Sequence, residues 1–247
     1  RVAQRAAEQV VLSERLVYRY EGDPLAHFRA TCTEKQTTQF FIEDEYLTTF
    51  GATPEVIAEK KGRCFETTVL AGTAPVERLE KLQTTKEKEE HEMLVQAITQ
   101  RLSIPFEQSD RFILPLRYVH HYATTLRLKT DNLFRCWSAV FPADTLVGTP
   151  REQASRIIER TERVSRQLFG GAVGLLSQKE EHFSLAIRMA VCAQGQVMYQ
   201  SGAGITKESS EKEEREEMRK KRALFQLGAK KEETRREEEN EHVSFID

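Results

Sequence analysis

The chain has few of the residues and sequence runs that mark specialised classes of protein. Its four cysteines lie far apart in 247 residues and form no C-x-x-C pair, which argues against structural zinc and a disulfide framework. We expect Cys32, Cys64, Cys136 and Cys192 to be buried, reduced thiols of a cytoplasmic protein. No apolar run approaches the roughly 20 residues of a membrane span, and no basic-then-apolar leader is present. Because the chain begins at Arg1 rather than Met, we expect a fragment or a trimmed chain, in which any leader would not be visible.

Strong charge of one sign is also missing. The formal net charge is -2 and the pI is near 6.4, so we expect neither nucleic acid nor a membrane as partner. The sequence contains no complete G-x-G-x-x-G motif or P-loop, and no Ser/His/Asp arrangement can be argued from it. Nucleotide binding and triad hydrolysis are therefore not favoured.

The N-terminal part of the chain is rich in β-branched and aromatic residues. Segments 9–20, 39–56 and 63–73 have the composition of strands, and turns with Gly or Pro (EGDP, GATP, KKG) separate them. With 39% apolar residues, the chain can bury one large core, and we expect one domain. Strands first and helices interspersed favour an α+β fold over a doubly wound parallel sheet.

Three segments have helical patterns. Residues 75–102 place apolar side chains at i, i+3 and i+4 spacing. The sequence TPRE at 149–152 resembles a helix start, with Thr as N-cap, Pro in the first turn and Glu closing a capping box. A last helix is expected over about 207–227. Beyond it, residues 228–247 are nearly all charged and are expected to form a solvated or disordered tail.

An arginine stands within a predicted hairpin over 184–201 that turns at 193–195. Strand alternation in SLAIRMAV places Arg188 on one face with Ala186 and Ala190. These small neighbours leave space above the guanidinium, as a bidentate carboxylate site requires. A surface arginine on a half-exposed strand explains the pattern equally well.

The last helix carries charged residues in line with apolar ones. Glu214, Glu217 and Lys221 share a stripe with Leu224 and Phe225, so we expect the three charged side chains to face inward. Two carboxylates three residues apart suit a hard cation such as Mg²⁺. The alternative is a solvated, charged helix face.

Glu90 is a lone carboxylate in the apolar stripe of the long helix. It is in line with Met93, Leu94 and Ala97, and such a glutamate calls for a cation. Alternatively, the helix is not yet buried at this point. The segments GGAVG and SGAG contain small residues that would let a substrate carboxylate reach backbone N–H groups.

Several blocks, taken in order, resemble the chorismate-utilising enzymes, a family that includes the anthranilate, aminodeoxychorismate, isochorismate and salicylate synthases. The resemblance extends from about Gln9 to Phe225 and implies a two-sheet β-sandwich surrounded by helices. It also implies a catalytic domain over 1–227 whose preceding family strands are missing here. The blocks are QVVLSER, FGATPE, VLAGT, EKEEHEMLV, the segment around His121, FPADTLVGTPREQA and the run from Gly170 to Lys221.

The resemblance implies Mg²⁺ as cofactor and a charged substrate site. Glu90 and Glu217 correspond to the family's metal ligands, with Glu214 beside them, and the metal would hold the ring carboxylate of chorismate. Arg188 and Lys221 correspond to the groups that hold the substrate's carboxylates.

The resemblance also assigns a proton donor. Glu55 corresponds to the general acid that protonates the departing C4 hydroxyl, and Gln9 stands at the position of the general base. Backbone N–H groups near Gly72 and Gly202 would assist substrate binding. The other predicted substrate-binding residues are Thr73, His121 and Thr145.

The residues that the resemblance links to the choice of product point to different reactions. Gln96 and Gln100-Arg101 replace the Asp and Asn-Asp of amine-transferring members, which favours addition of water. In contrast, Gln9 replaces the lysine that activates water, and a neutral amide cannot accept a proton at neutral pH as an amine can. Thr145 replaces an alanine typical of isochorismate synthases, and Glu14 replaces a frequent arginine.

We predict a Mg²⁺-dependent isochorismate synthase-like isomerase, which adds water at C2 of chorismate with loss of the C4 hydroxyl, in menaquinone or siderophore biosynthesis. One alternative is an amine-transferring anthranilate or aminodeoxychorismate synthase component with a glutaminase partner. Another is a catalytically degenerate homologue that binds chorismate.

Overall fold

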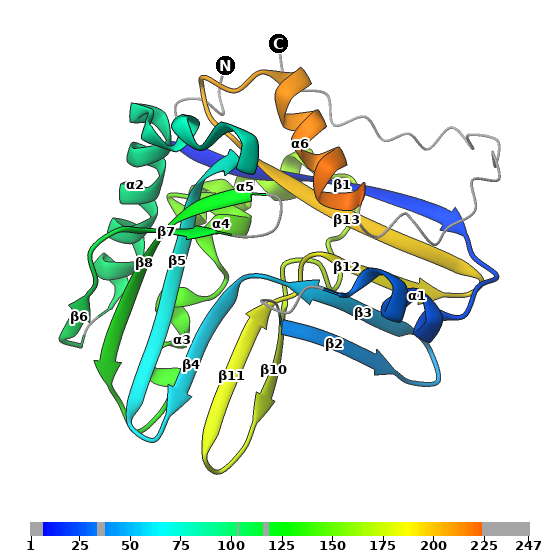
Figure 1. Ribbon diagram of the computed structural model, residues 1–247, viewed down its shortest axis with the longest axis horizontal. Coiled ribbons are helices and arrows are strands. Elements are labelled where there is room, and N and C mark those ends of the chain that lie inside the picture. The colour runs from blue at the N-terminus through cyan, green and yellow to red at the C-terminus, as the bar shows by residue number, and fades with distance from the viewer. Residues whose placement is uncertain (1–6, 34–37, 103, 116–118, 224–247) are drawn as a thin grey trace. The chain divides into compact units, whose positions relative to one another are not determined.

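The computed structural model describes residues 7–33, 38–102, 104–115 and 119–223 (Figure 1). The contacts within the chain define two compact units, each built around its own antiparallel sheet. The first unit comprises Arg1–Thr53, Leu146–Gly171 and Ala186–Asp247, and the second comprises Pro54–Thr145 and Ala172–Leu185.

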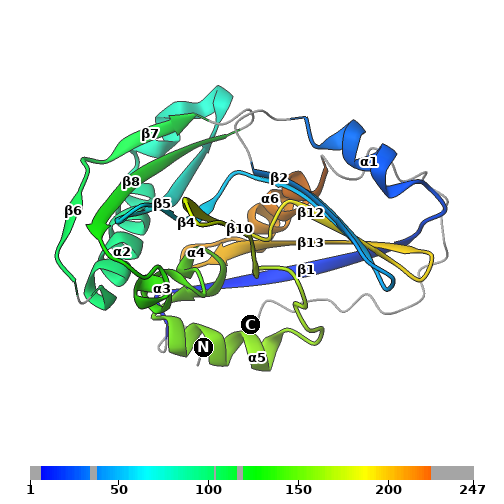
Figure 2. The same ribbon diagram turned by 90° about the horizontal axis from the view of Figure 1, so that it is seen from below.

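The sheet of the first unit has the strand order β2-β3-β12-β13-β1-β9. A hydrophobic cluster with Phe50 and Tyr199 at its centre packs against it. Helix α6 packs on β13, and α5 packs on β1 and β9 (Figures 1 and 2). The strands are β1 (Gln9–Arg19), β2 (Thr38–Glu43), β3 (Thr48–Thr53), β9 (Gly148–Thr149), β12 (Met189–Ala193) and β13 (Gln196–Ile205); the helices are α1 (Pro24–Thr31), α5 (Arg151–Thr161) and α6 (Glu211–Ala223).

The sheet of the second unit has the order β10-β11-β4-β5-β8-β6, and β7 also pairs with β8. Helix α2 packs along β5, and its buried face includes His91, Leu94 and Ile98. The strands are β4 (Val56–Lys61), β5 (Cys64–Pro75), β6 (Phe106–Gln108), β7 (Phe112–Pro115), β8 (Val119–Lys129), β10 (Ala172–Leu176) and β11 (Glu180–Leu185); the helices are the 3₁₀ helix η2 (Val76–Gln83), α2 (Thr85–Arg101), α3 (Phe134–Val140) and α4 (Asp144–Val147).

The predicted α+β fold with two β-sheets is confirmed. The long helix is present as η2 followed by α2, and the hairpin forms between β12 and β13. Its turn residues Gln194 and Gly195 both have positive φ, 51° and 72°, as a two-residue turn between twisted strands requires. No helix in the described ranges has the length and apolar character needed to cross a membrane.

Three local predictions are wrong. SLAIRMAV is not one strand, because β11 ends at Leu185 and β12 begins at Met189 in the other sheet. Thr149 does not cap a helix: it pairs with Gln9 in β9, and α5 begins after Pro150 without a side-chain cap. The segment GATP is not a turn, because Gly51, Ala52 and Thr53 are the last residues of β3. The segment EGDP does contain a bend, at Gly22, and its Asp23 caps α1 by accepting the N–H of Leu25 at 2.9 Å.

The cysteine prediction holds at three of four positions. All four thiols are free, and Cys64 is exposed where β5 leaves its turn, whereas the other three are buried. Burial raises the pKa of the Cys32 and Cys192 thiols to about 11, so both are protonated at neutral pH.

Two predictions concern parts of the chain outside the described residues. Leu224 and Phe225, expected on the buried stripe of the last helix, lie there, as does the expected tail over 228–247. The single catalytic domain over 1–227 stays a prediction beside the two compact units.

Gly148 supplies a test of the β1–β9 contact. Its φ is 113°, and a Cβ atom there would lie 2.2 Å from the carbonyl oxygen of Gln9. Gly148→Ala should therefore lower the free energy of unfolding by at least about 2 kcal/mol. At Gly195, φ is 72° but no atom lies within 4 Å of a built Cβ, so Gly195→Ala should cost only about 1 kcal/mol. Denaturant unfolding of both variants measures the difference; equal losses would show that the close approach to Gln9 is unimportant.

Candidate active site

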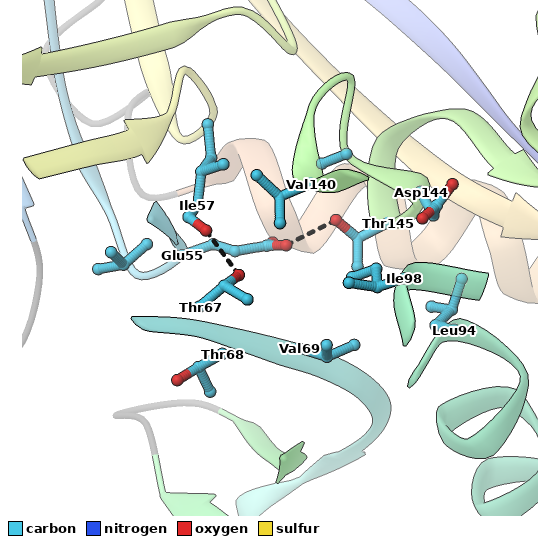
Figure 3. A pocket seen from close by; sticks show the side chains of 12 residues that line it. Glu55, Ile57, Thr67, Thr68, Val69, Leu94, Ile98, Val140, Asp144 and Thr145 are labelled. Carbon is cyan, nitrogen blue, oxygen red and sulfur yellow. Dashed lines mark hydrogen bonds between the residues drawn. The ribbon is translucent and has the colours of Figure 1, made fainter. Parts of the chain in front are cut away.

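The candidate acid Glu55 lies at the entrance to β4 in the second unit. Its backbone carbonyl accepts the N–H of Leu185 at 2.9 Å, which anchors the main chain to β11. Its Oε1 accepts a hydrogen bond of 2.6 Å from Oγ1 of Thr145 (Figure 3). Both side chains are half-buried. The structure thus brings together two predicted site residues that are 90 positions apart.

Glu55 and Thr145 line a pocket whose remaining wall is largely apolar (Figure 3). The polar groups on the wall are already engaged: Thr67 Oγ1 donates to the carbonyl of Ile57 at 2.6 Å, and Asp144 forms an ion pair with Arg101. The carboxyl of Glu55 therefore accepts a hydrogen bond from a hydroxyl in a pocket with mostly aliphatic walls. The lining residues are Glu55, Val56, Ile57, Thr67, Thr68, Val69, Leu94, Ile98, Val140, Ala143, Asp144 and Thr145.

Gly72 and Thr73 form an irregularity in the pairing of β5 with β8. The register shifts between Ala71 and Thr73, and Gly72 has a φ of 72°. Thr73 Oγ1 lies 2.9 Å from Nδ1 of His121, so these two predicted residues are in contact. The N–H of Thr73 donates to Glu87 Oε2 at 2.7 Å. A substrate carboxylate at this N–H would have to displace Glu87.

Sequence reasoning missed Glu87, although a signal was present. Glu87 stands three residues after Thr84, the N-cap of α2, which is the acidic position of a capping box. The local pattern explains a carboxylate in the first turn of the helix. It contains nothing about β5, which the carboxylate reaches only in the folded chain.

The candidate metal ligand Glu90 is half-buried on α2, beside the face that buries His91, Leu94 and Ile98, and its role as a ligand stays a prediction. The next residue, His91, was not singled out, yet it is only 1% exposed. Its Nε2 lies 2.7 Å from Oγ1 of Thr124 on β8. Burial lowers the pKa of His91 to about 4, although the carbonyl of Ala71 acts in the opposite direction. His91 is therefore neutral at pH 7.

The first unit gathers the candidate substrate cations. Arg188 has a φ of 50°, and its Nη1 donates to the carbonyl of Lys221 at 3.4 Å. Lys221 Nζ donates to the carbonyl of Gly202 at 2.8 Å and lies 2.5 Å from Glu217 Oε1. The predicted residues Arg188, Gly202, Glu217 and Lys221 thus form one network. Arg188 lies in a bend before β12 rather than on a strand face.

The carboxylates of α6 fit a hard cation by their chemistry. Glu214 is 7% exposed and Glu217, one turn later, is half-buried, and carboxylate oxygens are the ligands that Mg²⁺ prefers. Glu90 belongs to the second unit. Within the described residues, no group of three or more His, Cys, Asp or Glu side chains is close enough to hold a metal ion. The three-carboxylate magnesium site stays a prediction.

Gln9, at the predicted base position, is buried at the start of β1. It is 3% exposed and pairs with Thr149. A Cβ atom at Gly204 would lie 2.5 Å from its Nε2, so the glycine makes room for the amide. The structure therefore places a neutral amide, packed on a glycine of β13, at this position.

The fold together with these charged groups defines a class of protein: the chain belongs to the chorismate binding enzyme family, whose model matches residues 1–226. Among curated proteins, it is 35% identical over 237 residues to anthranilate synthase component 1 of Thermococcus kodakarensis, covering 88% of this chain and 55% of that protein. It is 33% identical over 249 residues to anthranilate synthase component 1 of Streptomyces coelicolor, covering 91% of this chain and 48% of the relative. The chain spans about half the length of these relatives.

Solved structures show the same fold. Anthranilate synthase component I from Streptococcus pneumoniae TIGR4 matches with a TM-score of 0.80 at 25% identity, over 90% of this chain and 54% of that one. The menaquinone-specific isochorismate synthase from Escherichia coli also gives 0.80, at 22% identity, over 90% and 56%. The predicted family is confirmed.

His91 supplies a pH test of the buried face of α2. Since its folded-state pKa of about 4 lies below the ordinary value of 6.5, the unfolded chain binds a proton first as the pH falls. The free energy of unfolding should therefore fall by up to about 3 kcal/mol from this group as pH drops from about 6.5 to about 4. His91→Gln should lose less over this range because its amide does not titrate.

The measurement is denaturant unfolding of both proteins at several pH values, with the His91 ring followed directly by NMR. Matching pH slopes, or a ring that titrates near 6.5, would contradict this account of His91.

Proposed function

We propose that this chain is the chorismate-binding part of an amine-transferring synthase of the anthranilate synthase type. The observation that carries the proposal is the 35% identity with anthranilate synthase component 1 along 88% of the chain. Gln9 supports it, because its amide cannot take a proton from water at neutral pH. Thr145 supports it as well, because members of the family that go on to eliminate pyruvate have threonine at the corresponding position. We infer a cytoplasmic enzyme from its free, mostly buried thiols.

In this reaction the nitrogen of ammonia forms a bond to C2 of chorismate, and the bond from C4 to its hydroxyl breaks. Glu55 is the proposed acid: it gives its proton to the departing hydroxyl, which leaves as water. The hydrogen bond from Thr145 to Oε1 fixes the orientation of the carboxyl that gives this proton. Loss of the C2 proton and of pyruvate, by cleavage of its C–O bond to the ring, then gives an aromatic amine.

The charged groups have proposed roles in holding the dianionic substrate. Arg188 offers a planar pair of N–H donors for a carboxylate, and Lys221 offers a compact cation. The carbonyl of Gly202 accepts a hydrogen bond from Lys221 Nζ and so holds the ammonium group in place. Mg²⁺, when bound, neutralises the ring carboxylate, with Glu214 and Glu217 of α6 and Glu90 of α2 as its proposed ligands. Thr73 and His121 complete the proposed substrate-binding residues.

A glutaminase subunit is the proposed source of ammonia. The relatives named above are component 1 of anthranilate synthase, a name that implies at least one further component. The partner is therefore a separate protein or domain under this proposal.

Water addition to give isochorismate is the second candidate. Gln96 and Gln100-Arg101 favour it, because they depart from the amine-transferring pattern in the block after Glu90. In the structure Arg101 pairs with Asp144, whose side chain is 1% exposed, so this departure contributes an ion pair beside the pocket.

Incubation of the chain with chorismate and Mg²⁺, with and without ammonium at alkaline pH, separates the candidates. Under the proposed function an aromatic amine or amino intermediate forms only when ammonium and Mg²⁺ are both present, as identified by chromatography and mass. Isochorismate formed without ammonium would establish the water-adding reaction instead. Mg²⁺-dependent binding of chorismate by calorimetry without any product would indicate a degenerate homologue.

Glu55→Gln tests the proposed acid. The amide keeps the size of the side chain but carries no transferable proton, so kcat should fall by at least about 100-fold with little change in chorismate affinity. The matched control is Glu66→Gln, which removes a carboxylate from an exposed pair with Arg127 in the same unit and should retain kcat within about twofold. Normal turnover by Glu55→Gln would exclude it as the acid.

A further inference from the structure

An ion pair that the sequence did not reveal joins α6 to the sheet of the first unit. Arg222 on α6 is 6% exposed, and its Nη2 lies 2.6 Å from Oε2 of Glu14 on β1. Its Nη1 donates to Oγ of Ser201 on β13 at 2.9 Å. Glu14 and Ser201 are direct partners in the antiparallel register of the two strands. One guanidinium therefore spans two adjacent strands from above.

Two further contacts hold the same helix face against the sheet. Ser201 Oγ donates to the backbone carbonyl of Met218 at 3.0 Å, so the hydroxyl links Arg222 to the helix backbone one turn earlier. Arg215 Nη1 lies 3.5 Å from Glu14 Oε1. Arg215 and Arg222 are seven residues apart and thus lie on one face, two turns apart. Glu14 is held between two cations of α6.

We call Glu14, Ser201 and Arg222 the Glu14–Ser201–Arg222 cluster. Ser201 and Arg222 are neighbours in the sequence of proposed site residues, and Glu14 holds the helix that carries two of these residues. Lys221 directly precedes Arg222, and Gly202, whose carbonyl accepts from Lys221 Nζ at 2.8 Å, directly follows Ser201. Lys221 also lies 2.5 Å from Glu217 Oε1. A rotation or shift of α6 that broke the Arg222 contacts would therefore move Lys221 and Glu217 together.

The buried charge of Arg222 restricts the position of α6 on the sheet. A buried guanidinium is strongly unfavourable without a hydrogen-bonded anion, and Glu14 is the carboxylate that meets it. Nη1 and Nη2 of the rigid guanidinium fork contact Ser201 and Glu14 at the same time, which restricts the rotation of the helix. A lysine has a single nitrogen and cannot make both contacts in the same geometry.

We propose that Glu14 and Arg222 are positioning residues: their ion pair sets the rotation of α6 on β1 and β13, and so places Lys221 and Glu217 for the substrate carboxylate and the metal. The inference rests on the proposed function for the identity of the ligands. The contacts with Ser201 and Met218 are independent of it. Residues that hydrogen-bond to metal ligands typically change metal affinity by about 10- to 100-fold when removed, and Glu14 and Arg222 act on Glu217 indirectly, through the helix that carries it.

The test uses two mild variants and a control on the same helix. Arg222→Lys keeps the charge and loses the fork, and Glu14→Gln keeps the shape and loses the charge. Arg219→Lys is the matched control, because Arg219 is 68% exposed and pairs only along the helix with Glu216. Hydrogen exchange of the α6 amides is measured without ligand, with the β5 and β8 amides as the internal reference for global stability.

We expect both variants to exchange their α6 amides at least about tenfold faster than the wild type relative to the reference strands. We also expect Mg²⁺-dependent binding of chorismate, measured by calorimetry, to weaken by about tenfold or more in both. Arg219→Lys should change neither quantity. Unchanged α6 exchange in both variants, or faster exchange with unchanged binding, would overturn the positioning role.

Failure of the proposed function has a different signature. Wild-type protein that binds no chorismate with Mg²⁺ contradicts that function, while the exchange of α6 in the unliganded variants still decides whether Glu14 and Arg222 fix the helix. If amide exchange changed equally in α6 and in all strands, the ion pair would have a purely structural role and the inference would be rejected.

Discussion

The long antiparallel pairing of β1 with β13 is the contact on which the charged groups of the first unit depend. It runs from Val10 opposite Ile205 to Arg19 opposite Gln196 and sets Glu14 opposite Ser201. Because α6 follows β13 in the chain, the same pairing presents a carboxylate, a hydroxyl and the carbonyl of Gly202 to one helix face. A shift of one residue would turn Glu14 to the other side of the sheet and leave Arg222 without its anion.

In the second unit the corresponding constraint is the pairing of β5 with β8. Its irregularity at Gly72 turns the N–H of Thr73 toward Glu87 and brings Thr73 against His121. The first turn of α2 is thereby joined to the sheet, and its buried face carries His91. The irregularity makes the bond to Glu87 possible, because in a regular strand the N–H of Thr73 would donate to the neighbouring strand.

The two units carry different parts of the proposed chemistry. The second contributes the acid Glu55, oriented by Thr145, and the first contributes the cations Arg188 and Lys221 with the carboxylates of α6. Membership of the chorismate binding enzymes supports chorismate as the proposed substrate. Of the positions on which the proposed choice between ammonia and water rests, Gln9 is buried in the sheet and Arg101 is paired with Asp144.

Local patterns in the sequence predicted the α+β class, the strands of the N-terminal part and the β12–β13 turn, because periodicity and turn chemistry are local properties. Ordered blocks also identified the family. Local patterns gave wrong predictions at Arg188, where strand alternation predicted a strand face, and at Thr149, where a helix-capping pattern belongs to the end of a strand. Three features depend on the tertiary structure alone: the hydrogen bond from Thr73 to Glu87, the lowered pKa of His91 and the ion pair of Glu14 with Arg222. Each of these depends on which distant strand or helix lies opposite and how much water it excludes, and neither quantity is present in a local pattern.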